Sequence, residues 1–166
     1  QIVYASSAHC VGFIKRGEPI DHRTFPRPNG EYAISKAYGE FAASYFADNF
    51  GLNILAIRIG YLGEDLSKER RLRTWVSARD LVQLIEIGLH NNIGFNVTYG
   101  VSNNPEPFFD NGNAFRLGYQ PQDSSVDFVT DKSVLQEKPD MNTIEGGLVG
   151  GGFSAANFTG DPKRLL

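Results

Sequence analysis

Three short apolar segments, separated by helix-like stretches, constrain the fold of this chain more than any other feature. They lie near 2–6 (IVYAS), 53–59 (NILAIRI) and 95–101 (FNVTYGV), and turn-forming residues flank each of them. Between the first two, EYAISKAYGEFAASYFADNFG (31–51) carries apolar residues at helical spacing, and Gly51 stands just past the helix end. This alternation of strands and helices is typical of a doubly wound parallel sheet, so we expect an α/β fold.

The second long helix is predicted over SARDLVQLIEIGLHNN, ending near His90. Ser77 and Asp80, three residues apart, have the spacing of a capping box, in which the first side chain caps the helix and the second reaches back. A short further helix is expected within 108–121, ending before Gly118. The polar, proline-bearing stretch from 15 to 30 is predicted to be a loop.

The last part of the chain shows no periodicity, and we expect 123–166 to be a small irregular C-terminal region. Its glycine cluster at 146–152 has neither of the two phosphate-binding glycine patterns, and no helix pattern follows it. We therefore interpret this glycine cluster as part of a flexible tail. No repeat and no second independent domain is seen, so 1–166 is treated as one domain.

Composition narrows the class of protein. At 166 residues, with 41% hydrophobic and 21% charged residues, the chain has the composition of an ordinary globular domain. A net charge of −3 gives no support for a nucleic-acid partner, and no apolar run is long enough for a membrane span. Cys10 is the only cysteine, which fits a reducing, cytoplasmic setting. We interpret it as a small packing residue, with a thiol nucleophile as the alternative. The sequence is compatible with a homo-oligomer.

The first strand ends in an unusual set of side chains, since Ser6, Ser7 and His9 follow its apolar run. Serines commonly close strands, so one interpretation is a plain turn. The alternative is that this end of the strand faces a ligand, because open α/β sheets bind ligands at the carboxyl ends of their strands. The strand alone does not decide between the two.

Tyr32 and Lys36 lie at positions i and i+4 of the predicted 31–51 helix, so both side chains are on one face, one turn apart. A phenol ionises near pH 10, and a neighbouring ammonium favours the phenolate, which makes such a pair suitable as a base. A nearby hydroxyl, such as that of Ser7, can hold a substrate oxygen and share the moving proton. The alternative is a packed tyrosine beside a solvated lysine.

Three segments together, VYASSAHCVG, YAISKAYGE and LAIRIGYLG, resemble the extended short-chain dehydrogenase/reductase family, which includes sugar epimerases and dehydratases. The resemblance covers essentially the whole chain. It implies the C-terminal part of a Rossmann-type sheet, a partial NAD(P)-binding domain holding the catalytic half. It also implies a catalytic triad of Ser7, Tyr32 and Lys36 around the nicotinamide of NAD, with Ile59 to Tyr61 lining the nicotinamide pocket.

Three further features, Ser7 and His9 after the first strand, RTWVSARDLV (73–82) and YGVSNN (99–104), resemble the uronate dehydrogenases within this family, which oxidise hexuronic acids at C1 to aldarolactones. This resemblance implies that Arg70 binds the substrate carboxylate, and a guanidinium suits that geometry. The alternative is one more solvated charge in the KERRLR run. His9 is expected to contact a substrate hydroxyl, with a turn residue as the alternative. Trp75 and Asp80 are interpreted as structural residues, a packing anchor and a helix cap.

Two departures from the uronate dehydrogenase pattern are Ala8, where an asparagine is usual, and Tyr61, where a serine is usual. They leave the reaction class unchanged and make the identity of the sugar less certain. The glycine-rich first turn and the acidic residue that binds the adenosine ribose are absent, so NAD and NADP cannot be told apart. Because the chain begins with Gln1 directly before a strand, we also expect it to be a fragment, inactive by itself.

Two other functions compete with oxidation of a small sugar acid. A nucleotide-sugar epimerase or dehydratase would use the same three catalytic residues, but RIGYLG lacks the sequence usual there. A catalytically silent Rossmann-type binding protein would have no need of Ser7, Tyr32 and Lys36 together.

Overall fold

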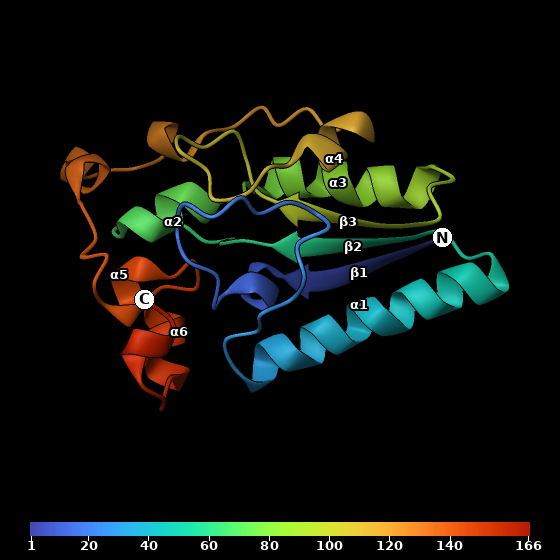
Figure 1. The fold of residues 1–166 in the computed structure, drawn as a ribbon. Helices are drawn as coiled ribbons and strands as arrows, with labels where there is room; N and C mark the ends of the chain where they lie inside the picture. The colour runs from blue at the N-terminus through green and yellow to red at the C-terminus, as the bar shows by residue number, and fades with distance from the viewer.

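The computed structural model describes residues 1–166. Its sheet has three parallel strands in the order β1-β2-β3, formed by Ile2–Ser7, Ile54–Ile59 and Phe95–Gly100. All three strands run in the same direction across Figure 1, so their carboxyl ends share one edge. The α/β class and the three predicted strands are thereby confirmed.

Helices cover both faces of this sheet. Helix α1 (Glu31–Phe50) lies on one face, and α3 (Ala78–His90) and α4 (Gly112–Arg116) lie on the other (Figure 1). The core between α3 and the sheet is apolar and includes buried Leu55, Ile57 and Leu84. Helix α1 runs opposite to the strands, which places its N-terminus near the sheet edge where the strands end.

Helix α1 forms where predicted and ends at Gly51, whose φ of 66° is the left-handed conformation that favours glycine. Its packing face, however, is made of small residues, among them Ala33, Ala37 and Ala47. The large apolar side chains that gave the helical spacing are exposed: Ile34, Tyr38, Phe41, Tyr45 and Phe46. The approach to β1 is close, because a Cβ at Gly39 would lie 2.1 Å from Tyr4 Oη.

The start of α3 confirms one half of the predicted cap and corrects the other. Ser77 Oγ accepts a hydrogen bond from Asp80 N at 3.1 Å, as a capping serine should. The Asp80 carboxylate does not return to Ser77, whose N–H donates to Ser102 Oγ instead. Asp80 accepts from Ser102 Oγ at 2.6 Å and from the backbone of Gln122, so it fastens a loop to the helix.

The expectation of an irregular, flexible C-terminal tail is wrong for its glycine-rich part. Helices α5 (Ile144–Gly147) and α6 (Gly152–Asn157) flank a turn, and every residue from 146 to 151 is buried. With α2 (Glu69–Thr74), they lie beyond the carboxyl ends of the strands (Figure 1). Short 3₁₀ turns complete the chain at Ala8–Val11, Ser125–Asp127, Lys132–Gln136 and Pro162–Arg164.

Two residues interpreted as structural have that role. Cys10 is fully buried, and burial raises the pKa of its thiol, so it packs rather than reacts. Trp75 is buried in a cluster with Leu66 and Leu72, and its indole N–H donates to Gly63 O at 3.0 Å. No helix of the chain combines the length and the apolar character needed to cross a bilayer.

Candidate functional site

The last residue of β1 lies directly beside the last residue of β2, since Ser7 and Ile59 are register partners. Ile59 is in turn the partner of Gly100 on β3. Ser7 is buried, and its Oγ accepts a hydrogen bond from the His9 backbone N–H at 3.2 Å. That bond uses an oxygen lone pair and leaves the hydroxyl proton of Ser7 free to be donated.

Tyr32 and Lys36 lie in the first two turns of α1, one turn apart as predicted. Lys36 Nζ donates to Ala5 O on β1 at 2.8 Å, which fixes this face of the helix against the strand that carries Ser7. The same ammonium lies 5.6 Å from the ring centroid of Tyr32. Tyr32 is 49% exposed, so about half of this residue remains accessible.

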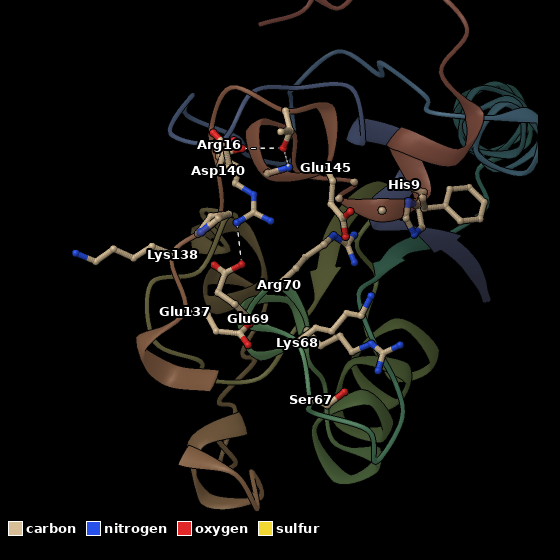
Figure 2. A pocket seen from close by; sticks show the side chains of 18 residues that line it. His9, Arg16, Ser67, Lys68, Glu69, Arg70, Glu137, Lys138, Asp140 and Glu145 are labelled. Carbon is tan, nitrogen blue, oxygen red and sulfur yellow. Dashed lines mark hydrogen bonds and ion pairs between the residues drawn. The ribbon is translucent and has the colours of Figure 1, made fainter. Parts of the chain in front are cut away.

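A cavity of about 730 Å³ opens beyond the carboxyl ends of the strands, between α2 and the C-terminal region. Figure 2 shows Arg70 extending into it from α2, with Lys68 on one side. Its lining is mainly polar and includes His9, Arg16, Lys68, Arg70, Glu145 and Phe153. Charged side chains of both signs are therefore arranged around a space large enough for a monosaccharide.

Arg70 is the arginine of the KERRLR run that is left without a carboxylate partner. Its Nε donates to Val149 O at 2.6 Å, and none of the ion pairs in the chain includes it. Arg71 and Arg73, in contrast, are each paired with acidic side chains. Burial, reinforced by the charge of Arg16, lowers the pKa of Arg70 to about 10, so it stays protonated at neutral pH. Its two terminal nitrogens are free to bind an anion.

His9 contacts both the strand end and the cavity. Its ring packs on Phe153 with 4.5 Å between ring centroids, and its Nδ1 lies 3.1 Å from Asn29 Nδ2. Burial, together with the positive charge of Arg70, lowers the pKa of His9 to about 4. His9 is therefore neutral at physiological pH and can act as a hydrogen-bond donor or acceptor but not as a cation.

The predicted site residues fall into two neighbouring groups. His9 and Arg70 line the cavity, whereas Ser7, Tyr32 and Lys36 do not. No hydrogen bond joins Ser7 to Tyr32, and His9, bonded to Ser7 through its backbone, is the link between the two groups. Tyr61 lies toward α2, where the guanidinium of Arg71 is 4.8 Å from its ring centroid.

Several cavity residues were not predicted from the sequence. Phe153 and Arg16 lie in segments with no motif. Asn29, which does not line the cavity but contacts His9, belongs to a PNG triplet that is typical of a turn. Arg16 pairs with Glu69 of α2 at 2.8 Å, and the two side chains are only 8% and 10% exposed. No group of three or more histidine, cysteine, aspartate or glutamate side chains is placed to hold a metal ion.

Replacing Gly151 with alanine is expected to destabilise the protein and displace Arg70. Gly151 has φ +61° and ψ −139°, and an added Cβ would lie 2.4 Å from Arg70 Cδ. The cost in the free energy of unfolding should be about 1–3 kcal/mol, as for other strained backbone positions. Gly94, also at φ +61° but with no atom within 4 Å of its added Cβ, is the matched control. Equal losses for Gly94→Ala and Gly151→Ala in urea denaturation would contradict the expected clash with Arg70.

Comparison with known proteins gives consistent results. No family model matches the chain. A uronate dehydrogenase from Pseudomonas putida is 39% identical over 159 residues, covering 94% of this chain and 58% of the relative. The crystal structure of a glucuronic acid dehydrogenase from Chromohalobacter salexigens superposes with a TM-score of 0.86 at 33% identity, covering 98% of this chain and 60% of that one.

The chain thus spans less than two thirds of the length of these relatives. A dTDP-glucose 4,6-dehydratase from Streptomyces venezuelae, at 19% identity and a TM-score of 0.59, shares the fold alone. The resemblance noted in the sequence is confirmed.

Proposed function

This chain is a homologue of the uronate dehydrogenases of the extended short-chain dehydrogenase/reductase family, and we propose that it carries the catalytic half of an enzyme of that activity. The full-length protein would oxidise a small hexuronic acid, such as glucuronate or galacturonate, at C1 to an aldarolactone, with NAD as oxidant. The reducing setting indicated by the lone, buried Cys10 agrees with action in the cytoplasm.

The observation that carries this proposal is the unpaired guanidinium of Arg70 in the cavity next to His9. Its two terminal nitrogens can form the paired hydrogen bonds that a carboxylate accepts. With its pKa at about 10, Arg70 remains a cation at the pH of the cell. A neutral sugar would leave that partly buried charge without a partner, which is unfavourable. The substrate class that the cavity suits best is therefore a sugar acid.

The carboxyl edge of the sheet fits a nicotinamide. Ile59, beside Ser7 in the sheet, offers an apolar contact, and the half-exposed Tyr32 and the ammonium of Lys36 flank the same edge. These three residues, with Tyr61, are the ones we propose to hold the nicotinamide and its ribose. NAD, when bound, supplies the acceptor for the hydrogen of C1. The chain has no glycine-rich pyrophosphate turn, so no residue is proposed for the adenosine half.

The proton chemistry is assigned to the three residues at this edge. The hydroxyl of Ser7, whose proton is free, donates to an oxygen of the substrate and orients it. Tyr32, as phenolate, takes the proton of the C1 hydroxyl. Lys36, held by Ala5 O within 5.6 Å of the Tyr32 ring, stabilises that negative charge. His9 donates to a second substrate oxygen.

The proposal is tested by reduction of NAD in the presence of different sugars. The full-length protein is assayed with glucuronate, galacturonate, glucose, glucose 6-phosphate and UDP-glucose, and NADH is followed by absorbance. We expect net NADH with the two uronates and little with glucose. Preference for glucose 6-phosphate would mean that Arg70 takes a phosphate instead of a carboxylate. Turnover of UDP-glucose without net NADH would identify an epimerase, and no turnover of any substrate would identify a binding protein.

Replacing Arg70 with alanine should lower kcat/KM for glucuronate and raise KM. Loss of a charge-assisted hydrogen bond of roughly 1.5–3 kcal/mol corresponds to about a 10- to 150-fold decrease. The low activity with glucose should change little, because that sugar has no group for the guanidinium.

Arg71→Ala is the matched control, since Arg71 is already paired with Asp65. It should leave the preference for the acid over glucose unchanged. Equal losses on both sugars in Arg70→Ala would show that Arg70 only supports the loop. An unchanged preference would exclude it as the carboxylate partner and point to Lys68, which lines the same cavity.

A further inference from the structure

Asn29, which precedes α1, is completely buried between the His9 ring and helix α6. Its side-chain Nδ2 lies 2.8 Å from Ser154 Oγ and 3.1 Å from His9 Nδ1. An amide NH₂ carries two protons, so one group can donate to both partners at once. The amide therefore connects the C-terminal region to the one imidazole that lines the cavity.

The direction of these hydrogen bonds follows from Ser154. Its hydroxyl donates to Gly12 O at 3.0 Å, so its oxygen is left to accept from Asn29 Nδ2. With Nδ2 facing Ser154, the second N–H of the amide points to His9 Nδ1, which must accept. The proton of a neutral imidazole then resides on the other nitrogen, Nε2.

We infer that Asn29 is a positioning residue that fixes His9 as the Nε2–H tautomer and so presents a hydrogen-bond donor to the cavity. This inference deepens the proposed function, because the donor would face an oxygen of the sugar acid held by Arg70. The ring itself is clamped, since Phe153 packs on it at 4.5 Å and Nδ1 is engaged by the amide. Nε2–H is left as the polar group that His9 can offer to a ligand.

The charges around His9 favour a neutral donor at this position. Arg70 from α2 is the charge that acts on the ring, and the other charged residues of the cavity include Arg16, Lys68, Glu69 and Glu145. A second cation beside Arg70 would be unfavourable in this partly buried space. The low pKa of His9, about 4, agrees with a ring that stays neutral over the physiological range.

One alternative orientation of the Asn29 amide exists, and an experiment can distinguish the two orientations. Asn29 Oδ1 is buried without a hydrogen-bond partner. Turning the amide over would point Oδ1 at His9, and the ring proton would then reside on Nδ1. The two arrangements differ in the tautomer of a single histidine, which ¹⁵N NMR distinguishes directly.

The first measurement needs no variant. The full-length protein, labelled with ¹⁵N-histidine, is examined near neutral pH by long-range ¹H–¹⁵N correlation, and His9 is assigned by the loss of its signals in His9→Gln. We expect the Nε2–H pattern. An Nδ1–H pattern would overturn the inference, and it would leave the proposed activity untouched because neither sugar nor cofactor is present.

The second measurement uses Asn29→Asp, which keeps the size of the side chain and replaces the donor with a carboxylate. The ring proton should move to Nδ1, and the titration midpoint of His9 should rise by about 1–3 pH units, as expected for an opposite charge in contact. His22 and His90 in the same spectra serve as internal controls and should not change. A variant that still shows Nε2–H at His9 would overturn the inference.

A functional readout accompanies the spectra. Above the new midpoint, His9 of Asn29→Asp carries no proton on Nε2, and kcat/KM for glucuronate should fall by about 10-fold through loss of one hydrogen bond. Below the midpoint, where both nitrogens are protonated, part of the loss should be recovered. A residue with only a structural role would give a loss that does not depend on pH.

Discussion

Replacing Tyr32 with phenylalanine in the full-length protein is expected to lower kcat for glucuronate by about 10²–10⁴ while leaving NAD affinity nearly unchanged. Phenylalanine keeps the ring that lies 5.6 Å from Lys36 Nζ and removes only the hydroxyl oxygen. Because Tyr32 is half exposed, the loss of that oxygen should not disturb the core. Steady-state NADH formation gives kcat, and cofactor titration gives the affinity.

Tyr38→Phe is the matched control for this change. Tyr38 is on the same helix, is 73% exposed and makes no hydrogen bond through its hydroxyl. Its replacement should leave kcat within a factor of about two. Wild-type turnover in Tyr32→Phe would remove Tyr32 from the mechanism, and equal losses in both variants would indicate an effect on the helix.

A buried ion pair between Glu40 and Arg58 joins α1 to the sheet. Glu40, 4% exposed, accepts from Arg58 Nε at 2.9 Å and Nη2 at 2.8 Å, and it also accepts from Ser6 Oγ at 2.5 Å. Arg58 in turn donates to Tyr99 Oη at 2.9 Å. The network ties the helix that carries Tyr32 to β1 and β2, so it holds the two halves of the proposed catalytic edge together.

Replacing Glu40 with leucine is expected to lower the free energy of unfolding by about 3–5 kcal/mol, because it leaves the buried Arg58 without a counter-charge. Leucine has a similar volume, so a cavity is not the cause. The double variant Glu40→Leu with Arg58→Met should regain much of the loss, since no uncompensated charge remains. Urea denaturation of the three proteins measures both effects.

Glu86→Leu is the control, since Glu86 is an exposed glutamate in the middle of α3. It should change the free energy of unfolding by no more than about 0.5 kcal/mol. A loss in Glu40→Leu as small as in Glu86→Leu would show that the buried pair is not required. A double variant as unstable as the single one would attribute the loss to packing.

The strands could be predicted from the sequence because each is a short run rich in β-branched, aromatic and other apolar residues, bounded by turn-forming residues. Helix α1 forms where the spacing of its large apolar residues predicted a helix, but those residues are not the ones that pack against the sheet. Ile34 and Phe41, which helped define the periodicity, are exposed, and alanines face the sheet. A chain that spans 58% of a relative's length can expose side chains whose burial depends on what lies outside it, and local periodicity carries no such information.

The residues that complete the site could not be predicted, because their roles depend on contacts between distant parts of the chain. Glu40 appears in sequence as one charge on a helix, and only the fold places it against Arg58. Asn29 meets His9 and Ser154 across 20 and 125 positions. The glycines from 146 to 151 looked flexible, yet they are buried, and Gly151 lies where the chain passes Arg70.

The proposed function rests most directly on the breaking of the C1–H bond of a hexuronate with transfer of that hydrogen to NAD. Glucuronate carrying deuterium at C1 is incubated with NAD and the full-length protein, and the reduced nicotinamide is analysed by mass spectrometry. We expect net NADH in which every molecule carries one deuterium, matched by an equal amount of aldarolactone. Reduced cofactor without deuterium, or sugar that keeps its deuterium while no net NADH accumulates, would contradict a uronate dehydrogenase activity.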